Sequence, residues 1–162
     1  MSGLSVSAQK VQQWLLTHGI DVTIFEYENP GRTAHEAAVV LNCDVAQIAK
    51  SIIFKGETSG RSVLVITSGA NRVDETKVAT FLDVTLAKTD ASFVREHTGF
   101  AIGGVPPIAH AIAGIVLMDE DLLRFDRVFP AGGTPHAMFA IDPAQLMKIS
   151  GARVACVKVD RT

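Results

Sequence analysis

The chain has 162 residues, of which 48% are hydrophobic and 20% are charged, close to the average of a globular domain. This length predicts one domain spanning residues 1–162, and the composition excludes a mainly disordered chain. Fifteen Lys and Arg against seventeen Asp and Glu give a net charge of −2. A broad basic face for non-specific nucleic-acid binding is therefore excluded, and any such contact must use a local patch.

Cysteine usage and the N-terminal sequence indicate a reducing cytoplasm. Cys43 and Cys156 form no CxxC pair, which excludes a disulfide framework and a zinc motif. The N-terminus lacks a signal peptide's apolar core, and no run reaches the roughly 18 apolar residues of a membrane helix. The histidines show no metal-ligand spacing, and no phosphate-loop or dinucleotide motif occurs. We therefore expect no metal, no other cofactor and no membrane association.

Helices and strands are interspersed from the start of the chain. Apolar positions at helical spacing, followed by Gly19, predict the first helix, and the Thr33-x-x-Glu36 pattern predicts a capping box that opens the second. Asn42 is expected as its left-handed C-cap, and Asp44 as the N-cap of a short third helix. The predicted elements are a helix over 7–18, a strand over 22–27, a turn at 29–31, and helices over 33–41 and 44–48.

A hairpin and then a mixture of helices and strands follow. The predicted strands cover 50–55, 62–67, 84–87, 115–118, 127–131, 136–141 and 153–159. The predicted helices cover 74–82 and 90–98, and a last one starts at Asp142-Pro143. Because these elements do not alternate strictly as βαβ units, the sequence predicts an α+β domain with a mixed sheet.

Lys50 begins a predicted strand. Period-2 geometry places it on one face with Ile52 and Phe54, so a charged side chain shares an apolar face. The ammonium group either extends from the strand end into solvent or lines a pocket, where partial desolvation strengthens its attraction for an anionic or carbonyl oxygen. The strand pattern alone leaves both interpretations open.

The segment 99–107 contains paired glycines followed by prolines. Without a Cβ, Gly103 and Gly104 allow the backbone to approach a ligand closely, and Pro107 restricts the loop that follows. Exposed N–H groups in such a loop can bind a carbonyl or a developing oxyanion, although a tight bend between two elements explains the same residues. Gly132 belongs to a similar turn. His136, after that turn, faces either a cleft or solvent.

Charged residues gather where a strand ends and a helix begins, over 68–77. Arg72 and Lys77 could contact phosphate, while Asp74 is expected as the N-cap of the helix. A solvated turn whose charges pair locally is the alternative.

Five motifs together resemble one known family. They are Thr33-x-x-Glu36-Ala-Ala, Gln47-Ile-Ala-Lys50-Ser-Ile-Ile-Phe54, Gly69-Ala-Asn-Arg-Val-Asp74-x-x-Lys77, Thr98-Gly99-x-x-x-Gly103-Gly104-Val-x-x-Pro107 and Ala131-Gly132. The combination, spread over residues 33–157, resembles the YbaK family of aminoacyl-tRNA deacylases, related to the editing insertion domain of bacterial prolyl-tRNA synthetases. The resemblance implies a mixed, strongly curved, barrel-like sheet with surrounding helices.

The resemblance also implies a function. A freestanding member would hydrolyse the ester of a mischarged tRNA, with tRNA for proline carrying cysteine, alanine or another small residue as the expected substrate. Lys50 matches the essential lysine of the family, and Gly103 and Gly104 match its glycine loop beside the substrate carbonyl. We expect Lys50 to orient the terminal adenosine or its phosphate, and both glycine amides to form an oxyanion hole. Water or a ribose hydroxyl would complete the reaction.

The remaining expectations follow from the same resemblance. Lys50-Ser51 is closer to the Lys-Ser form of YbaK-like members than to the Lys-Asn form of alanine editors. Prolyl-tRNA synthetase is the expected partner protein, although nothing in the sequence shows that contact, and the oligomeric state stays open. The residues expected to bind the substrate are Ser51, Arg72, Asp74, Lys77, Pro107, Gly132 and His136.

Two other functions fit the same residues. A non-catalytic module could bind a nucleotide or the aminoacyl end of tRNA without turning it over. A hydrolase of another small ester or thioester would also use the glycine loop, but would not need tRNA.

Overall fold

The computed structural model describes residues 3–27 and 33–160. Within them the chain forms five α-helices: α1 (Val6–Thr17), α2 (Ala34–Leu41), α3 (Glu75–Leu82), α4 (Ala91–Thr98) and α5 (Pro143–Ser150). Two short 3-10 helices, η1 (Val45–Gln47) and η2 (Glu120–Arg124), lie beside strands. No helix in the described ranges is long and apolar enough to span a membrane.

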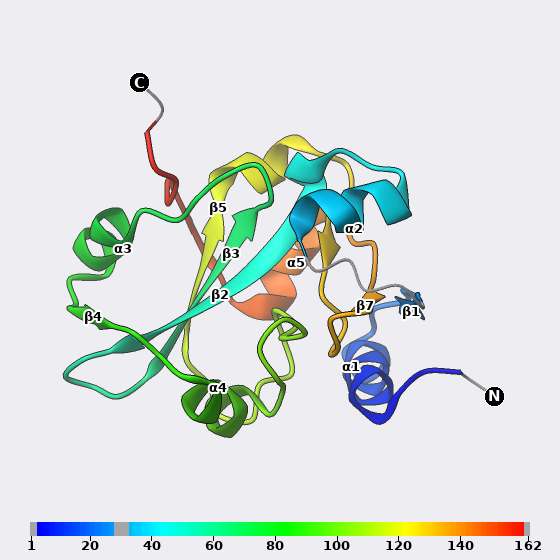
Figure 1. Ribbon diagram of the computed structural model, residues 1–162, viewed down its shortest axis with the longest axis horizontal. Helices are drawn as coiled ribbons and strands as arrows, with labels where there is room; N and C mark the ends of the chain where they lie inside the picture. Colours follow the sequence, from blue (N-terminus) through cyan, green and yellow to red (C-terminus); the bar gives the residue numbers. More distant parts are fainter. Residues whose placement is uncertain (1–2, 28–32, 161–162) are drawn as a thin grey trace.

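The strands form one large mixed sheet and a small pair. The strands are β1 (Phe25–Glu26), β2 (Ile48–Gly56), β3 (Ser62–Ser68), β4 (Leu86–Ala87), β5 (Ile115–Asp119), β6 (Phe129–Pro130), β7 (Ala137–Met138) and β8 (Arg153–Ala155). The large sheet has the order β4-β2-β3-β5-β8, with β6 beside β2, while β1 pairs with β7. The sheet is strongly curved, as a half-barrel, and β2 crosses the molecule in Figure 1. The predicted α+β fold is confirmed.

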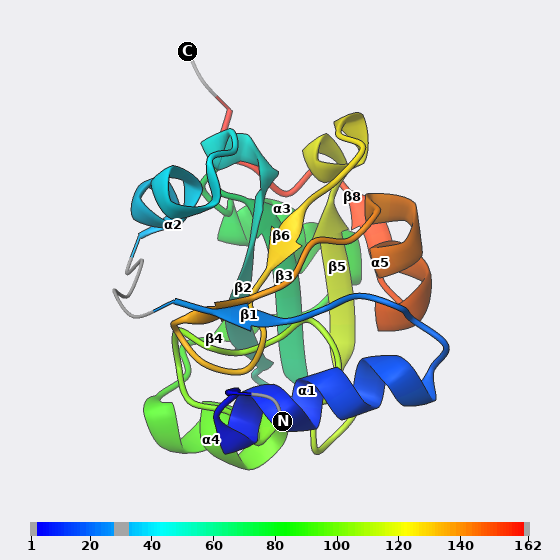
Figure 2. The same ribbon diagram turned by 90° about the vertical axis from the view of Figure 1, so that its right-hand side faces the viewer.

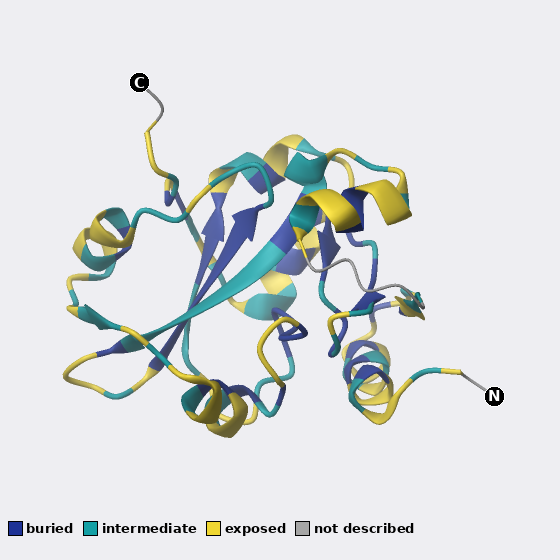
Figure 3. Cartoon of the chain, in the orientation of Figure 1, coloured by how far each residue is buried: buried dark blue, intermediate teal, exposed yellow. Residues whose placement is uncertain are grey.

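The two faces of β3 pack against different helices. Leu64 and Ile66 belong to the main core cluster, together with residues of α1 and with Leu146 of α5. The two helices α1 and α5 lie near one another in Figure 2. Val63 and Val65 point to the opposite face, where they pack with Val78 of α3. Because both faces are covered, β3 is buried along its whole length (Figure 3).

The edge of β2 opposite β3 is divided. At its start, Ile48 and Ala49 pair in parallel with β6, and at its end Lys55 and Gly56 pair with β4. Between these two pairings, none of the described strands lies against β2. This gap in the sheet edge is where the cavity described below opens.

The predicted N-caps are confirmed, whereas the capping box expected at Thr33 is not formed, because the Glu36 carboxylate accepts from the Thr33 hydroxyl and not from the Thr33 N–H. Thr33, Asp74, Asp90 and Asp142 are N-caps whose side chains accept backbone N–H groups. Asn42 ends α2 in the left-handed conformation with a φ of 54°, as expected.

Several predicted boundaries are wrong. The expected third helix over 44–48 is the 3-10 turn η1, and Ile48 already belongs to β2, because its carbonyl accepts the Gly69 N–H. The strands predicted over 22–27, 127–131, 136–141 and 153–159 are longer than the paired segments; before β1, for example, the backbone of Val22 and Ile24 bonds to the Gln12 side chain and not to a strand. Helix η2 was not predicted. The predicted turn at 29–31 lies outside the described residues.

Candidate active site

A cavity of about 290 Å³ lies at the open edge of β2. Three separate parts of the chain close it: the start of α2, the glycine loop before β5, and the segment from the end of β6 to β7. Its walls are mostly apolar. The described residues that line it are Tyr27, Thr33, Ala34, Ala37, Ile48, Ala49, Lys50, Ser51, Ile52, Ile102, Gly103, Val105, Ala131, Thr134, Pro135, Ala137 and Met138.

Lys50 lies near the start of β2 and lines this cavity, half-buried. It pairs with Thr67 of β3 and shares its strand face with Ile52 and Phe54, which matches the predicted face. Of the two interpretations left open by the sequence, the structure therefore favours the pocket-lining one.

Ser51 adds polar groups at the open edge. The Gly56 N–H donates to the Arg61 carbonyl, and the Ile48 carbonyl accepts from Gly69, so even-numbered residues of β2 exchange backbone hydrogen bonds with β3. The odd-numbered Ser51 consequently directs its N–H and C=O toward the open edge. Its hydroxyl is buried and has no hydrogen-bond partner among the described residues. The hydroxyl is enclosed by protein, so what Ser51 offers the cavity is its backbone at the open edge.

The two glycines of the loop have different roles. Gly103 lines the cavity with a φ of 96°, and its N–H has no partner among the described residues. The Gly104 N–H already donates to the Ala101 carbonyl over 3.1 Å. The expected oxyanion hole made of both amides is thus wrong for Gly104, because that donor is used within the turn.

Gly104 nevertheless must be glycine. A Cβ placed there would lie 2.5 Å from the Thr134 Cα, so the loop packs directly on the backbone of the Thr134 segment. This contact joins two walls of the cavity.

Two residues that were predicted to bind the substrate, Gly132 and His136, lie in the segment from β6 to β7 but do not line the cavity. The Gly132 N–H donates to the Ala137 carbonyl over 2.7 Å and fixes the turn. The His136 Nδ1 lies 3.3 Å from the Tyr27 carbonyl, so the ring is held beside β1. Both residues therefore support neighbours that line the cavity.

Four other predicted residues lie outside the cavity lining. Arg72 is exposed, and Asp74 caps α3 by accepting the Lys77 N–H. The Lys77 ammonium lies 2.7 Å from Asp160, a hydrogen bond that raises the pKa of the lysine. Pro107 lines a separate hollow with Trp14 and other residues. Their contact with a substrate stays a prediction.

Comparison with known proteins identifies the family. The family model "Aminoacyl-tRNA editing domain" matches residues 28–149, most of the chain. The chain belongs to this family. The curated protein YwhH of Bacillus subtilis (strain 168), described as uncharacterized, is 32% identical over 134 residues, which are 83% of each chain.

Two solved structures show how closely this editing domain resembles its relatives. One is a protein proposed to be a trans-editing enzyme for prolyl-tRNA synthetase; it is 42% identical with a TM-score of 0.93, over 98% of this chain and 100% of that one. The other, hypothetical protein APE2540, is 29% identical with a TM-score of 0.84, over 93% of this chain and 99% of that one.

The apolar walls of the editing-domain cavity were missed by sequence reasoning. The apolar side chains from α2 and β7 carry no chemical motif, and only the fold brings them to Lys50. Their positions in the sequence could have indicated them, because Ala34 and Ala37 follow the Thr33 N-cap, and Ala137 and Met138 follow the glycine turn. No cluster of three or more His, Cys, Asp or Glu able to hold a metal occurs in the described ranges.

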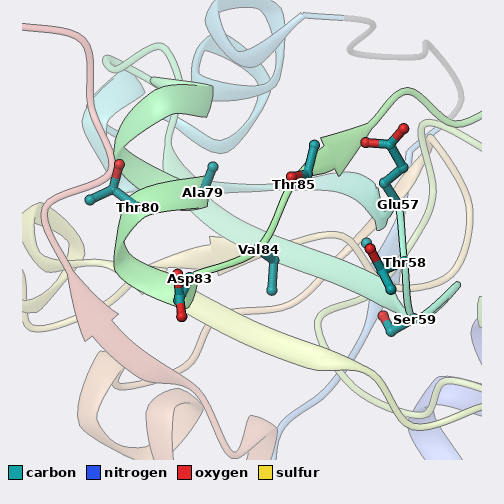
Figure 4. Close-up of a pocket in the computed structure, with 9 residues that line it drawn as sticks. Glu57, Thr58, Ser59, Ala79, Thr80, Asp83, Val84 and Thr85 are labelled. Atoms are coloured by element: carbon teal, nitrogen blue, oxygen red, sulfur yellow. The ribbon is translucent and has the colours of Figure 1, made fainter.

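A larger cavity, of about 570 Å³, lies elsewhere in the domain (Figure 4). The β2–β3 hairpin and the end of α3 line it, through Glu57, Thr58, Ser59, Ala79 and Asp83 among others. Its described lining has carboxylates but no Lys or Arg. It offers no positively charged group for an anionic oxygen, so we do not assign the active site to it.

Proposed function

We propose that this protein is a trans-editing aminoacyl-tRNA deacylase, which hydrolyses the ester of a mischarged tRNA. The expected substrate is tRNA for proline carrying cysteine, alanine or another small amino acid. The observation that carries the proposal is that Lys50 and the unpartnered Gly103 amide, far apart in sequence, line one small cavity. Family membership and the similarity to a protein proposed to edit for prolyl-tRNA synthetase support it.

The cavity suits an aminoacyl group with a small, uncharged side chain. Its volume of about 290 Å³ is at the lower limit for a small-molecule site. Ala34, Ala37 and Ala137 supply methyl groups rather than charges on its walls. A bulky amino acid would meet these walls, although exclusion by size separates one methylene by only about 1 to 3 kcal/mol.

The polar groups suit the reacting end of the substrate. The Gly103 N–H would donate to the ester carbonyl as negative charge develops on its oxygen. The Lys50 ammonium would hold the terminal adenosine or its phosphate and add positive charge beside the ester. The Ser51 N–H, directed toward the open edge of β2, would bind a polar group of the bound end.

The attacking group is assigned to water, which a neighbouring ribose hydroxyl of the substrate would orient. The described lining contains hydroxyl groups but no His, Cys, Asp or Glu that could activate them. With water, its oxygen bonds to the carbonyl carbon, the ester C–O bond breaks, and a proton passes to the departing ribose oxygen. The products are a free amino acid and an uncharged tRNA.

The partners and location follow from this function. With a net charge of −2, the protein should bind tRNA modestly and in a salt-sensitive way. A complex with prolyl-tRNA synthetase would raise the local concentration of mischarged tRNA. A cytoplasmic location is part of the same proposal.

The test measures deacylation of tRNA for proline charged separately with cysteine, alanine and proline. Wild type, Lys50→Ala and a matched control, Lys148→Ala, are compared at equal concentration; Lys148 is exposed on α5, outside the cavity lining. We expect loss of a noncognate residue with proline spared. Lys50→Ala should reduce the rate at least about a hundredfold, since it removes a positioned charge, while Lys148→Ala keeps the wild-type rate.

Three outcomes would contradict the proposal or the role that it gives to Lys50. A wild-type rate equal to spontaneous hydrolysis for these and other noncognate aminoacyl-tRNAs, with binding retained, would support a non-catalytic module. Hydrolysis of small esters without tRNA would support a general ester hydrolase. A Lys50→Ala variant that is folded by circular dichroism and fully active would refute the role of Lys50.

A further inference from the structure

Asp119, which the proposed mechanism does not use, is the one ionisable side chain that is fully buried in the described ranges. It is the last residue of β5, and its carboxylate accepts four hydrogen bonds. Oδ2 accepts from the Thr67 hydroxyl at 3.2 Å, the Ser68 N–H at 3.0 Å and the Asn71 side chain at 2.8 Å. Oδ1 accepts from the Asp121 N–H at 3.0 Å. A buried carboxylate with this many donors rigidly fixes the groups around it.

Asp119 and Lys50 lie in one row across the sheet. Lys50 is directly paired with Thr67 across the antiparallel β2–β3 register. The parallel β3–β5 register pairs Ile66 with Met118, which places Thr67 beside Asp119. Side chains at paired positions point to the same face, so Lys50, Thr67 and Asp119 project from one side of three adjacent strands.

A second connection runs through the backbone. Ser68, whose N–H is held by Asp119, donates its hydroxyl to the Ala46 carbonyl of η1 over 2.7 Å. The next N–H, of Gly69, donates to the Ile48 carbonyl over 2.8 Å. These bonds fix the chain immediately before Lys50.

The same turn also contacts the wall of the cavity. A Cβ at Gly69 would lie 2.9 Å from the Ala34 Cβ, so this turn packs closely against the first residue of α2. The segment from Thr67 to Gly69, which Asp119 holds through its first two residues, therefore contacts both the strand that carries Lys50 and one cavity wall.

We propose that Asp119 is a positioning residue for editing, which acts through Thr67 and the Ser68–Gly69 turn to fix Lys50 in the cavity. The proposal rests on the proposed deacylase function for its kinetic consequence. Asp119 itself does not line the cavity in the described structure, so it acts through its neighbours and not on the substrate.

Thr67→Val tests this inference with little change of shape, because both residues are β-branched and suited to a strand. Thr67→Ser keeps the hydroxyl and is the conservative rescue. Thr89→Val is the matched control, since the Thr89 hydroxyl also bonds to β2, at the Ile53 carbonyl, but lies outside the row.

We expect Thr67→Val to lower the single-turnover deacylation rate at saturating enzyme about tenfold, because a small displacement of a positioned group is costly. Thr67→Ser and Thr89→Val should retain the wild-type rate. In a Lys50→Met background, Thr67→Val should cause no further loss, since both changes affect one positioned group. A wild-type rate in Thr67→Val, or losses that multiply in the double variant, would overturn the proposal.

A second readout does not depend on activity. Lysines carrying ¹³C-dimethyl labels give separate NMR signals, and the Lys50 signal is the one lost in Lys50→Met. We expect that signal to shift or broaden in Thr67→Val and to stay unchanged in Thr67→Ser and Thr89→Val. If wild type does not deacylate, the proposed function fails, and an unmoved Lys50 signal in Thr67→Val separately refutes the positioning role.

Discussion

The cavity at the β2–β3 hairpin and the cavity at the edge of β2 differ in the groups that their walls bring together. The larger one, of about 570 Å³, forms where a hairpin and a helix end meet, and its charged groups are the carboxylates of Glu57 and Asp83. The smaller one, of about 290 Å³, forms at a gap in the edge of β2 and joins a lysine, an unpartnered amide and apolar walls. Convergence of complementary groups, and not volume, distinguishes the candidate site.

The largest expected difference between the two cavities is in the effect of replacing a neighbouring glycine by alanine on stability and activity. Gly104→Ala places a Cβ 2.5 Å from the Thr134 backbone, which cannot move away cheaply. We expect a loss of about 3 kcal/mol in the free energy of unfolding, measured by urea denaturation, together with loss of deacylation.

The control for that substitution is Gly56→Ala in the larger cavity. Its Cβ would meet the Ser59 hydroxyl at 2.7 Å, the end of a side chain that can rotate. We expect a loss below about 1 kcal/mol and full activity. Equal losses in the two variants would show that the glycine loop does not pack as tightly as described.

Filling each cavity with the same side chain gives the next largest effect. Ala131→Leu and Ala79→Leu each add three carbons, one to each lining. We expect Ala131→Leu to lower kcat/KM for a small mischarged residue about tenfold, because it takes space from the substrate. Ala79→Leu should leave kcat/KM unchanged, and a loss in that variant would bring the larger cavity into the function.

The helix caps beside the two cavities sharpen the comparison. Thr33 caps α2 at the smaller cavity, and Asp74 caps α3, whose end lines the larger one. Replacing either by Ala should cost about 1 kcal/mol of stability. Only Thr33→Ala should also slow deacylation per folded molecule; a slower rate in Asp74→Ala would instead support the contact with substrate that the sequence predicts.

The smallest effect concerns pH and lies outside both cavities. Hydrogen bonds from Lys158 and then from Asn71 lower the pKa of Asp121. A carboxyl whose pKa is depressed on folding stabilises the fold above its ordinary pKa, and this is lost as pH falls through the depressed value. Asp121→Asn should cost about 0.5 to 1 kcal/mol at neutral pH. The difference in stability between this variant and wild type, measured by thermal melting, should disappear at acidic pH. A difference that stays constant with pH would contradict this prediction.

Local signals in the sequence predicted much of the fold. Side-chain oxygens at Asp74, Asp90 and Asp142 begin helices by local chemistry, so their positions could be read directly. Helix η2 was missed because Asp119, its N-cap, also ends a strand and the acidic residues after it show no apolar period. The short pairings of β6 and β7 depend on neighbours in the curved sheet, which no local pattern contains.

The candidate site, like the fold, has some features that the sequence predicted and others that only the structure shows. Alternation along β2 predicted that Lys50 shares a strand face with Ile52 and Phe54. The glycine pair at 103–104 predicted a loop that can approach a ligand closely. Whether a given amide is available depends on its hydrogen bonds, so the difference between Gly103 and Gly104 appears only in the structure. The row from Lys50 to Asp119 likewise requires knowing that β5 lies beside β3.

The gap in the edge of β2 has a consequence for how substrate choice could change. The space comes from a missing strand neighbour, so its existence does not depend on the side chains around it. Alanines at positions 34, 37, 131 and 137 form much of its rim and walls. Single substitutions there can narrow the space step by step while the sheet keeps its pairing. A scaffold of this kind can acquire new amino-acid preferences through point mutations, without a change of fold.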